Sequence, residues 1–190
     1  TKRHFIQCFP SRPILTYQKL LTEHSLLVQQ FQSRLRLLST VRLLSFIAAL
    51  ISGYYFFKTG NSFLLILSLL LLSSFLYLIR VYDRWKSQFE LNKALVRINQ
   101  TEINLLSGLP AEYENGKEYI DPHHPYSYDL DIFGEASLFP LINRTTNSFG
   151  KTDLAKTLLH PNTKIIEDRQ QAIRELSDDI SFRQRLQATG

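Results

Sequence analysis

The sequence predicts a mainly α-helical protein whose first half is a two-helix transmembrane hairpin with cytosolic helical extensions. Two almost uncharged apolar runs, each about as long as a bilayer is thick, lie close together near the start of the chain. Apolar residues at helical spacing continue on both sides of these runs. A turn-rich stretch then precedes a final region whose pattern is again helical, from residue 135 to 190.

Composition narrows the class of protein. Cys8 is the only cysteine, so neither an internal disulfide nor a cysteine-rich zinc site is expected. The net charge of +5 is compatible with anionic lipid or nucleic acid as a partner and does not choose between them. Methionine is missing even from the first position, and the chain stops at RQRLQATG, so we expect a piece of a longer protein.

The two apolar runs have the length of membrane spans. Residues 41–57 read VRLLSFIAALISGYYFF, and residues 62–79 read SFLLILSLLLLSSFLYLI. At ~1.5 Å per residue, each run reaches roughly 25 to 27 Å as a helix. A helical hairpin in a soluble core is the main alternative, but residues 64–72 are apolar on every face. A signal peptide would lie nearer the N-terminus.

Charged and aromatic residues at the ends of the runs predict the topology. Arg42 opens the first run, Arg80 and Arg84 follow the second, and the turn contains only Lys58. Excess positive charge marks the cytoplasmic side, so we expect a multi-pass protein of the cytoplasmic (inner) membrane with both ends in the cytoplasm. Trp85 lies at the inner end, where an aromatic belt is expected.

Helical extensions are predicted on the cytosolic side of both spans. Residues 1–40 contain a juxtamembrane amphipathic helix that Pro13 can open, and residues 41–80 form the hairpin. Residues 81–107 continue the second helix until Gly108 and Pro110 end it.

The linker at 108–134 is rich in turn formers. Asn115-Gly116 favours a small hairpin with Tyr119 and Ile120 on its second arm. A possible metal cluster comprises Asp121, His123, His124, Asp129 and Asp131. We favour turn chemistry instead, because prolines flank the adjacent histidines and their side chains would diverge along an extended segment.

The stretch TTNSFGKTDLAKTLL imitates a phosphate-binding loop. That loop requires a glycine five residues before Gly150, where this chain has Thr145, and it requires a preceding buried strand. The residues before it, LFPLI, resemble a short helix instead. We therefore expect Asn147 or Ser148 to cap a helix whose buried face includes Leu154, Ala155, Leu158 and Leu159.

Two more helices complete the C-terminal region. Asn162 or Thr163, just after Pro161, is expected to cap the first. Ser177 or Asp178 is expected to start the second.

Residues 126–176 carry an ordered series of short motifs that resembles the opening of the core region of the MutS family of DNA mismatch repair ATPases. The matching positions are Asp129, Asp131, Phe133, Gly134, Leu138, Asn143, Thr145, Gly150, Leu154, Leu158, Pro161, Ile166, Arg169, Ala172, Ile173 and Leu176. The hairpin resembles the membrane-associated branch of that family. Residues 135–190 would then be the start of an all-α MutS-like core domain.

The resemblance implies that ATP, Mg and DNA binding belong to the full-length protein, which would be a DNA-dependent ATPase and a homodimer. The present part would carry no catalytic, cofactor-binding or metal-binding residue. Phe133-Gly134-Glu135 has the spelling of the family's mismatch-reading Phe-x-Glu motif, but it lies in the lead-in to the core. Mismatch recognition is therefore not implied.

A different class remains open: a membrane-anchored structural or interaction protein without a nucleic-acid role. The lysines and arginines after residue 150 alternate with aspartates and glutamates, as on an ordinary solvated helix face.

Overall fold

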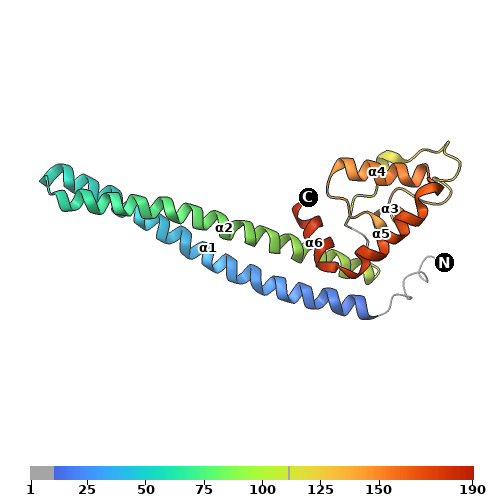
Figure 1. The fold of residues 1–190 in the computed structure, drawn as a ribbon, viewed down its shortest axis with the longest axis horizontal. Helices are drawn as coiled ribbons and strands as arrows, with labels where there is room; N and C mark the ends of the chain where they lie inside the picture. Colours follow the sequence, from blue (N-terminus) through green and yellow to red (C-terminus); the bar gives the residue numbers. More distant parts are fainter. Residues whose placement is uncertain (1–10, 111) are drawn as a thin grey trace. The chain divides into compact units, whose positions relative to one another are not determined.

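The computed structural model describes residues 11–110 and 112–190, so Cys8 and the other residues before position 11 lie outside the described part. The prediction of a mainly α-helical chain is confirmed, because all regular structure in the described residues is helical (Figure 1). The α-helices are α1 (Ser11–Thr59), α2 (Ser62–Leu106), α3 (Leu138–Ile142), α4 (Ser148–Leu159), α5 (Ile166–Asp178) and α6 (Ile180–Thr189). Two short 3-10 helices are η1 (Lys117–Tyr119) and η2 (Thr163–Ile165).

Each predicted apolar run and its extension form one uninterrupted helix. Helix α1 has 49 residues and α2 has 45. Gly60 has a φ of +66° in the turn between them, a conformation that glycine adopts without strain. Asn61 then begins α2 by accepting a hydrogen bond from the amide of Phe63 at 3.0 Å. Both helices are long and apolar enough to cross a membrane.

The chain folds as two compact units. The first, called here the hairpin unit, comprises residues 22–93. The second, called here the C-terminal unit, comprises residues 94–190 together with the beginning of α1 up to Leu21.

Small residues bring α1 and α2 together in the apolar part of the hairpin unit, where the two helices run antiparallel (Figure 1). Ala49 and Ser52 are each 6% exposed. The Ser52 hydroxyl donates to the carbonyl of Leu64 at 2.9 Å, and the Ser68 hydroxyl donates to that of Ala49 at 3.1 Å. Small and hydroxylated residues at a helix contact are typical of membrane helices, which associate through close packing and interhelical hydrogen bonds.

Many large apolar side chains of this unit are exposed, although Phe31 with Trp85 and Phe46 with Phe75 stack between the two helices. Residues such as Leu50, Phe57, Phe63, Leu70 and Tyr77 are each more than half exposed. In the most apolar 18-residue window of α2, none of the residues is buried. Exposed apolar surface of this extent is typical of contact with a membrane or with another protein.

The core of the C-terminal unit consists of Phe133, Phe139, Ile132 and Ala155. Phe133 and Phe139 stack with ring centroids 5.3 Å apart. Gly116 has a φ of +66°, and a Cβ there would lie 2.9 Å from both rings, so glycine is required on conformational and steric grounds. Leu154, Leu158 and Leu159 pack against this core from α4, as the sequence predicted.

Most predicted boundaries are confirmed. Asn147 caps α4 by accepting from the amide of Gly150 at 2.8 Å. Asn162 accepts from the amide of Lys164 at 3.0 Å and so caps η2, the 3-10 turn before α5, whereas α5 itself begins after Ile165 without a side-chain cap. Helix α2 ends before Gly108, whose φ is +82°. The LFPLI segment forms α3.

Two expectations were wrong. Asn115-Gly116 does not close a β-hairpin, because the left-handed Gly116 leads into η1 and Tyr119 turns toward the aromatic core. Ser177 and Asp178 do not start the last helix, because α5 continues through both. Asp179 caps α6 instead, accepting from the amide of Phe182 at 2.9 Å and from the hydroxyl of Ser181 at 2.8 Å.

Candidate functional site

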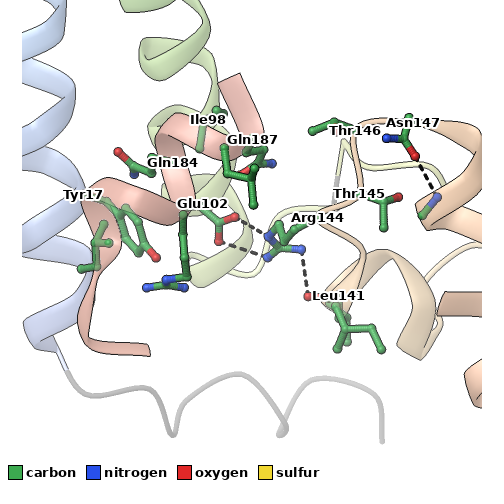
Figure 2. Close-up of a pocket in the computed structure, with 15 residues that line it drawn as sticks. Tyr17, Ile98, Glu102, Leu141, Arg144, Thr145, Thr146, Asn147, Gln184 and Gln187 are labelled. Carbon is green, nitrogen blue, oxygen red and sulfur yellow. Dashed lines mark hydrogen bonds and ion pairs between the residues drawn. The ribbon is translucent and has the colours of Figure 1, made fainter. Parts of the chain in front are cut away.

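A cavity of about 580 Å³ lies in the C-terminal unit among α1, α2, α6 and the segment that joins α3 to α4 (Figure 2). Its apolar lining comes from Ile98, Leu141, Ile142, Ile180 and Leu186. Its polar lining comes from Tyr17, Glu102, Arg144, Thr145, Thr146, Asn147, Arg183, Gln184 and Gln187.

An ion pair between Glu102 and Arg144 dominates the polar wall. Arg144 Nε donates to one carboxylate oxygen at 2.5 Å, and Arg144 Nη2 donates to the other at 3.1 Å (Figure 2). The Glu102 side chain is 12% exposed and the Arg144 side chain 30%. Arg144 Nη1 also donates to the carbonyls of Leu141 and Asn143. The guanidinium therefore joins α2 to the end of α3 through a planar, two-pronged contact that lysine cannot reproduce.

Tyr113 completes this cluster. Its hydroxyl donates to a Glu102 oxygen at 2.9 Å, and the Arg144 guanidinium carbon lies 4.3 Å from the centre of its ring. Burial, reinforced by the negative charge of Glu102, raises the pKa of Tyr113 from 10.0 to about 12. Tyr113 is therefore held in its neutral, hydrogen-donating form. Burial likewise raises the pKa of Tyr17, which lines the same cavity.

A buried amide pair fixes α6 beside α2. Asn99 is 0% exposed and Gln184 is 6% exposed. Gln184 Nε2 donates to Asn99 Oδ1 at 2.8 Å, and Asn99 Nδ2 donates to the carbonyl of Leu95 at 2.7 Å. Buried polar groups satisfied in this way favour one arrangement of the helices over others, because a shifted helix would leave them unpaired.

The segment between α3 and α4 holds its shape through Asn143, which is 3% exposed. Asn143 Oδ1 accepts from both the amide and the hydroxyl of Thr145, at 3.1 Å and 2.6 Å. Asn143 Nδ2 donates to the carbonyl of Glu114 at 3.2 Å. One side chain thus ties the linker to the segment that precedes α4.

The Gly150-Lys151-Thr152 sequence starts a helix and is not arranged as a phosphate loop. Lys151 Nζ pairs with Glu114 at 2.5 Å and with Glu118 at 2.9 Å, and these contacts raise the pKa of Lys151 above its ordinary range. The Thr152 hydroxyl lies 3.0 Å from that of Tyr119. Both side chains that would contact phosphate and magnesium in such a loop are therefore engaged within the protein.

The acidic and histidine-rich turn lies elsewhere in the C-terminal unit. Within residues 13–110 and 112–190, no three His, Cys, Asp or Glu side chains are grouped closely enough to hold a metal ion. Asp121 caps a turn by accepting from the amide of His123 at 2.9 Å. His124 Nε2 and the Tyr126 hydroxyl both contact the carbonyl of Leu159, at 3.1 Å and 2.8 Å, and so close the end of α4.

The predicted family-motif residues occupy two kinds of position. Phe133, Gly134, Asn143, Thr145, Gly150, Leu154 and Leu158 are buried or half-buried in the C-terminal unit. Phe133 stacks on Tyr119 and Phe139, so its ring is not free to wedge beside a base. Exposed positions are those of Asp129, Asp131, Leu138, Pro161, Arg169, Ala172 and Leu176.

The predicted membrane-flanking residues lie in the hairpin unit. The guanidinium carbon of Arg42 lies 5.1 Å from the centre of the Tyr82 ring, and that of Arg34 lies 4.8 Å from the centre of the Trp85 ring. Arg80 and Arg84 are exposed on α2, and Lys58 is exposed at the end of α1.

The Glu102, Tyr113 and Arg144 cluster was missed from the sequence. One signal was present: Leu95, Ile98 and Glu102 follow at spacings of three and four on the buried face of α2, so a carboxylate stands in an apolar stripe. A buried carboxylate requires a partner, but nothing in the sequence identifies Arg144, 42 residues later, as that partner.

Searches against protein-family models, curated proteins and solved structures give no match to this chain. In the cavity wall, Glu102 and Arg144 engage each other, and the Arg183 guanidinium donates to the carbonyl of Ser177 at 3.2 Å.

Proposed function

We propose that this chain is the membrane-anchoring and core-opening part of a MutS-like DNA-binding ATPase, with both ends on the cytoplasmic side of the inner membrane. One observation carries the proposal: the same chain contains a two-helix apolar hairpin at 41–80 and, after a helical extension and a linker, the ordered motif series at 129–176. Catalysis, ATP with Mg, and DNA contacts belong to the full-length protein, which we expect to act as a homodimer.

The side-chain packing of the hairpin unit supports the membrane anchor. Side chains on a helix point toward its N-terminus, and the Arg42 guanidinium follows this rule by stacking on Tyr82. The charge is thereby drawn toward the basic end of the hairpin. The apolar surface of α1 then extends from residue 37 to residue 57, which is roughly 31 Å of helix and enough to cross the hydrocarbon layer.

The C-terminal unit supports the role of a mechanical element. Proteins that transmit a nucleotide-driven change need rigid connections between helices, because coupling travels through contiguous packed networks. The Glu102–Arg144 pair and the Asn99–Gln184 pair supply such connections from α2 to α3 and to α6. Motif residues Asn143 and Gly150 set the turn that leads into α4.

A second candidate is a membrane-anchored interaction protein without a nucleic-acid role. It is favoured by the engagement of basic side chains within the C-terminal unit, since Lys117, Lys151 and Arg144 are all paired with glutamates. Paired cations contribute less to phosphate binding than free ones, because the contact must first be broken.

Full-length protein in lipid nanodiscs separates the two candidates. The first predicts ATP hydrolysis whose rate changes on addition of DNA, and DNA affinity that falls steeply as salt rises. The second predicts neither, even at low salt. The 190-residue chain in the same nanodiscs is the matched control and should bind no ATP.

Topology is tested with a membrane-impermeant maleimide on sealed cells. Cys8, the native single cysteine, should react only after permeabilisation. In a C8S background, N61C in the turn should react from outside. Labelling of both cysteines from the same side would contradict the hairpin.

A further inference from the structure

The structure points to a binding surface for anionic phospholipid headgroups around the cytosolic end of the hairpin. We propose that six cations form this surface, called here the basic collar: Arg34, Arg36, Arg42, Arg80, Arg84 and Lys86. This inference rests on the membrane anchor of the proposed function and adds a preferred lipid class to it.

The helix register places these cations at nearly one level. Phe31 packs on Trp85 and His24 Nδ1 lies 2.9 Å from Asn92 Oδ1, which fixes how α1 and α2 align. In this register Arg36 lies at the level of Arg80. Five of the six cations then fall within about six residues along the helices, a band of roughly 9 Å. Arg42 joins them by reaching back to Tyr82.

That band is close to, and slightly thicker than, a headgroup layer. A bilayer about 40–45 Å thick with a hydrocarbon core of about 30 Å leaves roughly 5–8 Å for headgroups on each side. The apolar stretches of α1 and α2 begin directly beyond the collar, at residues 37 and 79. The collar therefore coincides with the phosphate level when the apolar stretches fill the hydrocarbon core.

The collar cations are available for ligands. Arg36, Arg80, Arg84 and Lys86 are exposed, and none of their side chains forms an ion pair with a described residue. Arg34 and Arg42 are held over the faces of Trp85 and Tyr82, which orders them without neutralising their charge. Asp83 is the one acidic residue among residues 30–42 and 80–86, so the collar remains strongly positive.

The opposite end of the hairpin differs. The turn contains Lys58 alone, and its neighbours are exposed aromatic residues such as Tyr54, Tyr55 and Phe57. A zwitterionic interface suits such an end. The contrast places the excess of positive charge at the collar end alone.

Trp85, the only tryptophan of the chain, makes the proposal measurable. The 190-residue chain is reconstituted in phosphatidylcholine vesicles that contain phosphatidylglycerol. Either the phosphatidylcholine or the phosphatidylglycerol carries bromine near the headgroup end of its acyl chains. Quenching of Trp85 by each lipid gives the relative association of anionic and zwitterionic lipid with the collar.

We expect phosphatidylglycerol to associate with the collar about five-fold more strongly than phosphatidylcholine. This ratio corresponds to the attraction of one basic residue to an anionic surface. The preference should fall at high salt. Replacing Arg36, Arg80, Arg84 and Lys86 by glutamine should bring it close to unity. The control replaces Lys164, Arg169, Arg174 and Arg185 by glutamine, which removes equal charge from the C-terminal unit, and it should keep the preference.

Equal quenching by both lipids in the wild-type chain would overturn the proposal that the collar binds anionic lipid. A lipid preference that persists after the four collar substitutions would overturn it as well. Loss of the preference on addition of inorganic phosphate at constant ionic strength would assign the surface to a soluble anion and overturn the lipid assignment. Absence of quenching by either lipid would instead refute membrane insertion, and thus the anchor part of the proposed function.

Discussion

Replacement of Arg144 by alanine should destabilise the C-terminal unit by about 2–3 kcal/mol. Removing one partner of a fully buried ion pair costs about 3–5 kcal/mol, because the other charge stays buried without a partner. Arg144 is 30% exposed and Glu102 is 12% exposed, so water can recover part of that cost. The substitution also removes the contact with the Tyr113 ring and the bonds to two backbone carbonyls.

The conservative change R144K should cost about half as much, since lysine keeps the charge but loses the two-pronged geometry. The control is K117A, which removes an ion pair to Glu135 whose side chains are 57% and 79% exposed. Exposed pairs contribute little to stability, so this variant should unfold like the wild type.

The assay is pulse proteolysis in urea of the chain in nanodiscs, following cleavage within residues 112–190. For a unit of this size, about 1–2 kcal/mol per M of urea is expected, so R144A should lower the midpoint by more than ~1 M. A midpoint shift for R144A no larger than that for K117A would refute the reasoning, because it would mean that the pair contributes no more than a surface contact.

Three further outcomes are expected. The variant N147A removes the cap that accepts from Gly150 and should lower stability by about 1 kcal/mol in the same proteolysis assay, whereas N147D should not. The variant G116A places a Cβ 2.9 Å from the rings of Phe133 and Phe139 at a φ of +66°, so amide hydrogen exchange near η1 should speed up markedly. Because the pKa of Tyr113 rises from 10.0 to about 12 on folding, its contribution to stability is complete below pH 10 and is lost as pH rises toward 12. The decline in midpoint between pH 10 and 12 should therefore be smaller in Y113F, and an unchanged decline would contradict the assignment.

The helices of this chain were predictable because their signals are local. Apolar runs of membrane length, the short turn between them and Gly108 after α2 indicated the ends of the two long helices. Asn147 and Asn162 are helix-capping residue types that directly precede α4 and η2. In the structure, each side chain accepts a hydrogen bond from a backbone amide of the helix that follows it. Such signals depend on residues two or three positions apart, so they are visible in one sequence.

The wrong predictions fall at two kinds of position. At one, two neighbouring residues can both cap the helix; at the other, tertiary packing determines the backbone conformation. Asp178 and Asp179 both have the chemistry of a cap, and only the geometry selects Asp179. Asn115-Gly116 has the sequence of a hairpin turn, but the stacked rings of Phe133 and Phe139 occupy the space beside it. The partners in the cavity wall are 42 and 85 residues apart, beyond the reach of periodicity.

The exposed apolar surfaces of the two units differ in kind, and this difference bears on the proposed function. In the hairpin unit they encircle the helices, as lipid contact requires. On α5 they form one stripe, with Ile166 43%, Ile173 66% and Leu176 43% exposed. Glu167, Asp168, Arg169, Arg174 and Glu175 share the rest of that helix, and a membrane-surface helix would be basic there. A stripe with mixed charges around it suits a protein partner. Motif residue Leu176 belongs to this stripe, and the proposed function predicts that other helices of the core would cover it.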